Sequence, residues 1–202
     1  MYELTDLHET RLTRVTDVLR ATGAKRVLDL GCGVGLLLQC LLRETQFSEL
    51  VGLEQCPDAL AECRGTLASM PESAGRLTLL QGSYAESQPM LKGYDAAVMI
   101  ETIEHIEPGQ LTNVERTVFG ELCPGVLFIT TPNADFNPLY GLSPGQFRET
   151  DHKFEWSRRR FRRWASGAAE RNGYQVRFGG IGEQHETLGQ PTQTALFTRN
   201  PD

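Results

Sequence analysis

The sequence predicts a single α/β domain, spanning residues 1–202, around a doubly wound, mostly parallel sheet of seven strands. Strand-like and helical patterns alternate along most of the chain, and a glycine-rich turn follows the first strand. A chain of 202 residues is long enough for one ordinary hydrophobic core. The last two strand-like patterns have no clear helix between them, so we expect an antiparallel hairpin at one edge of the sheet.

Apolar spacing and helix-ending residues define the elements in order. Apolar side chains within residues 4–19 recur at helical spacing, and Gly23 ends this first helix. Ser157 is placed to cap the last helix, with Trp156 and Phe161 as a hydrophobic staple around its start. We expect strands at residues 26–30, 49–54, 76–81, 94–100, 125–130, 174–178 and 192–198, and further helices at 34–44, 57–69 and 109–120.

Composition indicates a soluble globular protein rather than one that grips long nucleic acid. Hydrophobic residues make up 40% of the chain, and the net charge is −6. No apolar run reaches the length of about 18 residues that a membrane span needs, and the acidic start lacks a secretory signal. We therefore expect a cytoplasmic protein with no membrane contact. The five cysteines form no Cys-x-x-Cys pair, which is typical of buried, reduced thiols rather than structural zinc.

Residues 148–163 are strongly basic, with seven basic and three acidic side chains in an acidic protein. A charge run of this kind is usually a solvated helix face. The sharper interpretation is a local contact with an anion or phosphate, directly next to His152.

The segment at about 131–153 is rich in breakers and shows no periodicity. Loops of this length in a compact domain are usually functional or disordered. Its aromatic residues Phe136, Tyr140 and Phe147 argue against disorder, so we expect a long active-site loop.

Two separate segments offer carboxylates and imidazoles. Glu101, Glu104 and His105 stand at i, i+3 and i+4, so one helical turn would place them on the same face. His152 lies in the long loop and is a candidate fourth ligand. A mixed Glu/His set suits a divalent ion such as Mg²⁺ or Mn²⁺. The alternative is that the acidic residues merely favour a helix start and that His105 is an ordinary surface residue.

A glycine-rich turn joins the expected first strand to the next helix. It reads Gly31-Cys-Gly33-Val-Gly35, and Asp29 precedes it. A dinucleotide fingerprint would require glycine at position 36, where this chain has leucine. The pattern resembles motif I of the class I S-adenosylmethionine-dependent methyltransferases. This resemblance implies the Rossmann-like methyltransferase fold, with Asp29 and the loop holding the methionine end of S-adenosyl-L-methionine.

The same resemblance implies two further cofactor contacts. Glu54 closes the second strand and matches the acidic residue that binds the ribose hydroxyls, because a carboxylate can accept from both. Ser83 follows the third strand and matches the adenine-contact position. The alternative for Glu54 is a solvated residue at a strand end.

Thr131-Pro-Asn-Ala-Asp-Phe-Asn, followed by the segment from Arg148 to Trp156, resembles the family that methylates the 2′-hydroxyl of the 3′-terminal nucleotide of RNA. The part of that family that this chain resembles is the catalytic domain of its bacterial type. The resemblance covers nearly the whole chain and implies a metal that also binds the 2′- and 3′-hydroxyls of the terminal ribose. Its implied ligands are Glu101, Glu104, His105 and His152.

The chemistry of such a transfer indicates roles for other groups. His105 or His152 would take the proton from the ribose hydroxyl, and Arg148 and Lys153 would meet the last phosphates. Loop aromatics would stack on the terminal base, and an RNA-repair protein is a possible partner. Two rival functions remain: a small-molecule O-methyltransferase with His105 as its sole base, or a non-catalytic module that binds cofactor or RNA.

Overall fold

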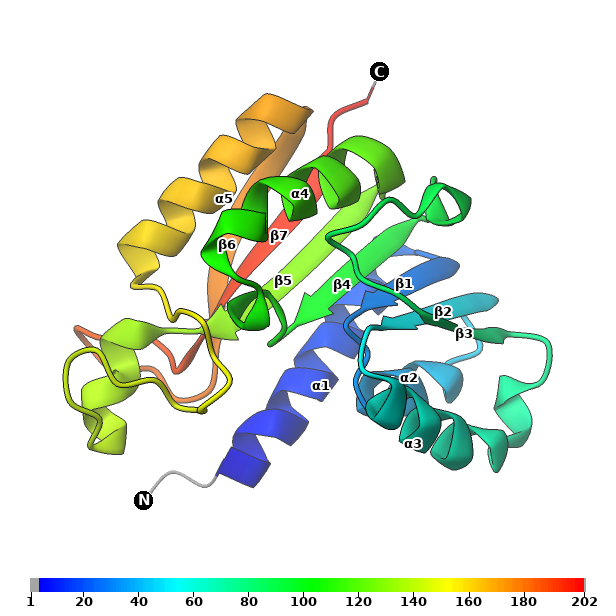
Figure 1. Cartoon of the computed structure of the whole chain (residues 1–202), viewed down its shortest axis with the longest axis horizontal. Coiled ribbons are helices and arrows are strands. Elements are labelled where there is room, and N and C mark those ends of the chain that lie inside the picture. The colour runs from blue at the N-terminus through cyan, green and yellow to red at the C-terminus, as the bar shows by residue number, and fades with distance from the viewer. Residues whose placement is uncertain (1–3, 202) are drawn as a thin grey trace.

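The computed structural model describes residues 4–201 as helices packed on both faces of one seven-stranded sheet (Figure 1). The strand order is β3-β2-β1-β4-β5-β7-β6, and β7 runs antiparallel to both of its neighbours. The strands are β1 Arg26–Leu30, β2 Glu49–Glu54, β3 Leu77–Gln81, β4 Ala96–Ile100, β5 Val126–Pro132, β6 Tyr174–Ile181 and β7 Thr192–Arg199. The predicted parallel sheet with an antiparallel hairpin at one edge is therefore confirmed.

Five α-helices accompany the strands: α1 Leu4–Thr22, α2 Leu36–Leu42, α3 Pro57–Ala68, α4 Leu111–Glu115 and α5 Arg158–Asn172. Helices α1, α2 and α3 cover one face of the sheet, and α4 and α5 cover the other (Figure 1). Successive strand residues alternate between these faces, because side chains in a strand point to opposite sides. In β4, for example, Ala97 and Met99 join the core beneath α5, whereas Ala96 and Val98 join the core beneath α1.

The neighbouring strands β1 and β4 are parallel. After β1 the chain continues to β2 on one side of this pair, and after β4 it continues to β5 on the other side. In open α/β sheets, ligands bind beyond the carboxyl ends of the strands at such a switch in strand order. Both segments singled out in the sequence, the turn after Leu30 and the turn after Ile100, begin at this edge.

The predicted helix at 109–120 is only partly correct. A 3₁₀ turn at Pro108–Gln110 leads into α4, and a π-helix at Arg116–Leu122 continues it. Ser157 caps α5 as expected, because its side chain accepts a hydrogen bond from the Arg160 backbone N–H. Trp156 and Phe161 lie in the same core cluster, which agrees with the expected staple.

The cysteine prediction is only partly correct. All five thiols are free, and Cys32 and Cys63 are buried, but Cys56 is exposed at the start of α3. No helix within residues 4–201 is long and apolar enough to cross a membrane. The long loop also contains more structure than expected, since residues Ala134–Tyr140 form a 3₁₀ helix capped by Asn133.

Candidate active site

The glycine turn after β1 borders open space with its backbone. Gly31, Gly33 and Gly35 all have positive φ, which side chains other than hydrogen disfavour. A Cβ at Gly31 would collide with Thr102, and one at Gly35 would meet the Cys63 sulfur at 2.6 Å. A Cβ at Gly33 would meet nothing within 4 Å. Gly31 and Gly35 are therefore required by the protein's own packing, whereas Gly33 faces room for a ligand.

Asp29 lies at the base of this turn as a buried carboxylate without a complete set of partners. Its side-chain oxygen Oδ2 is buried and accepts no hydrogen bond. Burial, together with the negative charge of Glu54, raises the pKa of Asp29 to about 7. A cationic group placed here would satisfy this oxygen and stabilise its charge, so the residue fits the ammonium of an amino-acid moiety.

Glu54 joins the end of β2 to the glycine turn. Its Oε2 accepts from the Gly33 N–H at 2.9 Å, and its Oε1 accepts from the Cys56 N–H at 2.8 Å. The side chain thus fixes the turn from behind and keeps further acceptor positions for two hydroxyls. Ser83 is half-buried after β3, and its hydroxyl accepts from the Ala85 N–H at 3.1 Å. The expected contacts of Glu54 and Ser83 with a cofactor stay predictions.

A cavity of about 260 Å³ opens between the glycine turn and α1. Asp29, Gly31 and Gly33 line one side, and His8 and Arg11 of α1 line another. Glu101, at the end of β4, also belongs to its wall. The cavity therefore connects the predicted cofactor residues to the first predicted metal ligand.

Glu101 does not join the other predicted ligands. It has a φ of 50°, a left-handed conformation that a non-glycine residue rarely adopts. Its Oε1 accepts from the Thr130 hydroxyl at 2.8 Å, and its Oε2 pairs with an Arg11 nitrogen at 3.1 Å. The expected helical turn is absent, because the chain leaves β4 through this strained residue and forms only a 3₁₀ turn at Ile103–His105.

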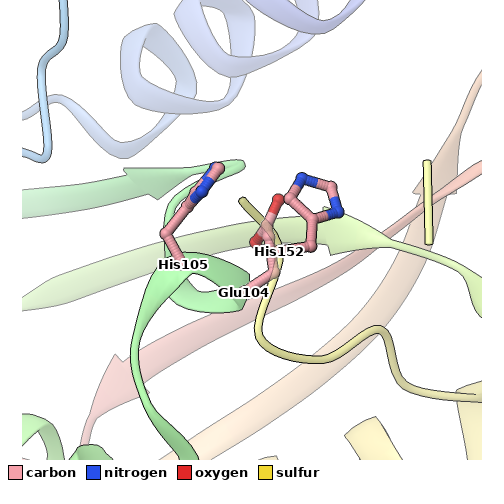
Figure 2. A group of neighbouring side chains, drawn as sticks. All are labelled: Glu104, His105 and His152. Carbon is pink, nitrogen blue, oxygen red and sulfur yellow. The ribbon is translucent and has the colours of Figure 1, made fainter. Parts of the chain in front are cut away.

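The other three predicted ligands, Glu104, His105 and His152, come together (Figure 2). One ligand atom of each lies within 4.8 Å of the others. Glu104 is fully buried, and its Oε2 accepts from the Thr131 hydroxyl at 2.9 Å while its Oε1 has no partner. Burial, with a smaller effect of the Glu101 charge, raises the pKa of Glu104 well above its ordinary value. A buried, unpartnered carboxylate oxygen beside two imidazoles fits a divalent cation.

Each histidine is oriented by a carboxylate. Nδ1 of His105 lies 3.0 Å from Asp151, and Nδ1 of His152 lies 2.6 Å from Glu155. If Nδ1 carries the proton in each hydrogen bond, Nε2 of each ring is left as a lone-pair donor, the usual arrangement for histidine ligands of metals. Burial lowers the pKa of His105 despite the opposing effect of Asp151, so its neutral form is favoured.

Glu155 is the centre of a polar network inside the long loop. Its carboxylate accepts from His152, from the Arg148 backbone N–H at 2.7 Å and from the Asn137 side chain. Burial alone would raise the pKa of Glu155, but these hydrogen bonds outweigh burial and lower it. The side chain therefore stays ionised and holds the His152 ring in place.

The network changes the expectations for two loop residues. The Arg148 guanidinium donates to Asn137 Oδ1 and to the Asn133 carbonyl, both at 2.8 Å, and lies over the Tyr140 ring. Arg148 therefore stabilises the loop, and its expected phosphate contact stays a prediction. Phe136 is buried and is not available for base stacking, whereas Phe147 is exposed and Lys153 is loosely paired with Glu107 at 3.7 Å.

Sequence reasoning assigned no role to Arg11, Asp151, Glu155 or Thr131. The spacing of Glu155, three residues after His152, is a signal that could have indicated the pair. The proximity of Arg11 to Glu101 has no local signal, because 90 residues of sequence separate them.

Comparison with known proteins gives consistent matches. A family profile described as a methyltransferase domain matches residues 7–178. The small RNA 2′-O-methyltransferase of Xenopus tropicalis is 37% identical over 204 residues, which cover 96% of this chain and 55% of the relative. The chain thus spans about half the length of the curated relatives that it matches.

Solved structures agree with this assignment. The methyltransferase domain of bacterial CtHen1 has a TM-score of 0.88 and 37% identity, covering 96% of this chain and 100% of that one. The small RNA methyltransferase HEN1 has a TM-score of 0.89 and 31% identity, covering 100% of this chain and 26% of that one. The predicted Rossmann-like methyltransferase fold is confirmed, and the chain belongs to the methyltransferase domain family and, within it, to the Hen1 methyltransferase domains.

Proposed function

We propose that this chain transfers a methyl group from S-adenosyl-L-methionine to the 2′-hydroxyl of the 3′-terminal nucleotide of RNA, with a divalent metal ion. The observation that carries the proposal is the convergence of Glu104, His105 and His152 next to a cavity lined by Asp29 and the glycine turn. The RNA substrate is supported by the small RNA 2′-O-methyltransferases to which the chain is similar.

The cofactor proposal is supported by the unsatisfied groups around the glycine turn. Asp29 would accept from the ammonium of the methionine moiety, and the open space at Gly33 admits the ligand close to backbone. Glu54 would accept from the ribose hydroxyls with the lone pairs that Gly33 and Cys56 leave free. Ser83 would contact the adenine.

The metal proposal is supported by the unpartnered oxygen of Glu104 and by the two oriented imidazoles. Glu104, His105 and His152 would hold Mg²⁺ or Mn²⁺, and Glu101 would join them by exchanging Arg11 for the ion. Such an ion would supply positive charge that lowers the pKa of the ribose 2′-hydroxyl. It would also require a vicinal diol, which favours RNA over DNA and a free 3′-hydroxyl over a 3′-phosphate.

One ring nitrogen cannot hold a cation and accept a proton at the same time, so the histidine that takes the proton must release the ion as it does so. His152 is the better permanent ligand, because a buried, ionised Glu155 fixes it. His105 is the better proton acceptor for two reasons: burial lowers its pKa, which keeps the ring neutral and able to take a proton in neutral solution, and its side chain is about one third exposed beside the exposed Asp151. The 2′-oxygen then forms its bond to the methyl carbon as the bond from that carbon to sulfur breaks, and S-adenosylhomocysteine leaves.

The test is methyl transfer from labelled S-adenosyl-L-methionine to a short RNA with Mn²⁺, with Mg²⁺ or with chelator. The same oligonucleotide ending in 2′-deoxyribose is the matched substrate control. We expect labelling only with the metal and the terminal 2′-hydroxyl. Equal labelling of both oligonucleotides, or full activity in chelator, would contradict the proposed mechanism.

Two histidine variants separate the roles. His152→Ala should abolish both metal binding and methyl transfer while leaving cofactor binding near normal, and His105→Ala should reduce methyl transfer more than metal binding. A small-molecule O-methyltransferase would need only His105, so unchanged activity in His152→Ala would favour that rival. An RNA-repair protein partner is proposed only from the family resemblance, and copurification with repair proteins would test it.

A further inference from the structure

The amino-terminal part of α5 carries a dense group of positive charges. Five of its first six residues are arginines, and no acidic residue lies in its first turn. Arg158 pairs with Asp135 at 3.1 Å and donates to the Thr187 carbonyl at 2.7 Å. The other four, which we call the arginine face, are exposed: Arg159, Arg160, Arg162 and Arg163.

This arrangement is unfavourable for an isolated helix. The positive end of a helix dipole disfavours cations, each by about 0.3–1 kcal/mol at an exposed site. Like charges three and four residues apart, such as Arg159 with Arg162 and with Arg163, add repulsion of a few tenths of a kcal/mol per pair. Positive charges that destabilise the helix carrying them indicate an anionic partner outside the helix.

The arginine face is not neutralised within the described chain. Across residues 4–201, no carboxylate pairs with any of its four guanidinium groups within 4.0 Å. Aromatic rings hold two of them, since Arg160 lies 5.5 Å over the Trp156 ring and Arg162 lies 5.5 Å over the Phe178 ring. Stacking orders a guanidinium while leaving its N–H groups available, so these donors are preorganised for an anion.

The arginine face begins close to the candidate active site. The segment between them is fixed at both ends, because Lys153 donates its backbone N–H to the Glu104 carbonyl at 2.8 Å and Trp156 bridges to Asn133. The cap Ser157 is the fifth residue after His152, so the two lie within about 18 Å even for extended chain. Figure 1 shows this segment leading from the edge of the sheet to the start of α5.

We propose that the arginine face binds the phosphodiester backbone of the RNA strand a few nucleotides before its 3′ end, an inference that rests on the proposed function. Six helical residues rise about 9 Å, which is long enough for the arginine face to meet more than one phosphate of the strand. The rest of this acidic chain repels a polyanion, so a local cationic strip selects the direction in which the strand leaves the site. Contact with phosphates carries no base information, so the interaction is independent of sequence.

The test replaces Arg159 and Arg163 together by glutamine, which keeps helix propensity and removes charge. Arg43→Gln with Arg64→Gln is the matched control, because both residues are exposed and lie on the opposite face of the sheet, with α2 and α3. Binding of a fluorescent twelve-nucleotide RNA is measured by anisotropy between 50 and 500 mM salt. The α5 variant should bind about tenfold more weakly at low salt, with a salt slope smaller by about 1.4, and the control should match wild type.

Methyl transfer distinguishes this inference from the proposed function. For a dinucleotide substrate, too short to reach the arginine face, the α5 variant should keep the wild-type kcat/KM, whereas the twelve-nucleotide RNA should lose about tenfold. Wild-type RNA affinity in the α5 variant, or an equal loss for both substrates, would overturn the inference while the proposed function stands. Failure of wild type to bind or methylate any RNA would overturn both. Competition by poly-glutamate as strong as that by RNA would indicate an acidic protein as the occupant instead.

Discussion

Raising the pH from 4 to 8 should destabilise the cofactor-free protein through its buried carboxyl groups, and Asp29 makes a contribution that can be measured on its own. In the unfolded chain this group ionises with a pKa near its ordinary value of 3.8, but in the fold burial raises the pKa to about 7. Below pH 4 the group is protonated in both states and costs nothing. As the pH rises toward 7, only the unfolded state gains from ionisation, so folding stability falls and then stays constant above pH 7.

The size of the effect follows from the two pKa values. Each pH unit between them corresponds to about 1.4 kcal/mol, so the full loss is about 4 kcal/mol, of which about 3 kcal/mol falls between pH 5 and pH 8. Asp29→Asn has nearly the same shape and cannot ionise, so it should remove this part of the pH dependence. The same variant should weaken cofactor binding, because it removes the anion proposed to accept from the ammonium.

The assay is urea unfolding of wild type and Asp29→Asn at pH 5 and pH 8 without cofactor. Other groups titrate in both proteins. We therefore compare how much free energy of unfolding each protein loses between pH 5 and pH 8, and the difference between these two losses reports on Asp29. Asp17→Asn is the matched control, because Asp17 is an exposed aspartate of α1. Parallel losses in wild type and Asp29→Asn would refute the argument that burial of Asp29 limits stability.

Three other substitutions test separate parts of the site. Glu104→Gln keeps the acceptor for Thr131 but removes the charge, so Mn²⁺, which should raise the Tm of wild type, should leave the Tm of this variant unchanged. Gly33→Ala should cost about 1–2 kcal/mol of stability at its positive φ and lower cofactor affinity in calorimetry, because the methyl group enters the open space. Arg148→Ala leaves two acceptors without their donor, so it should cost about 2–4 kcal/mol and expose residues 134–150 to proteolysis; resistance equal to wild type would contradict its role in the loop.

Periodicity predicted the strands well because most of them, β3 excepted, contain buried residues in a short apolar run. The predicted ends differ from the observed ends by three residues or fewer, the largest difference being the extension of β6 to Ile181. The helix at 109–120 was less predictable, since the switch from 3₁₀ to α to π geometry depends on tertiary packing rather than on residue type.

The candidate site was predictable where it depends on residues close together in the sequence, and unpredictable where it depends on distant ones. Asp29 lies in β1 and the glycine turn follows that strand directly, so their placement follows from the fold. The helical turn expected at Glu101 was wrong, because the spacing of an α-helix does not apply to a left-handed residue followed by a 3₁₀ turn. Arg148 and Phe136 were assigned to RNA from residue type alone, whereas their burial depends on partners elsewhere in the loop.

The position of β7 between β5 and β6 has a consequence for the order in which the protein matures. Asn133, at the root of the active-site loop, donates its side-chain N–H groups to the carbonyls of Leu188 and Gln190, and Arg11 donates to Thr192. The site is thus held by contacts among residues near positions 11, 133 and 190, which are very far apart in the sequence. During synthesis, β1 to β4 can pair as they emerge, but the loop and Glu101 must wait for residues 188–192 to leave the ribosome. A nascent chain therefore pairs its first four strands well before it acquires the capacity for chemistry.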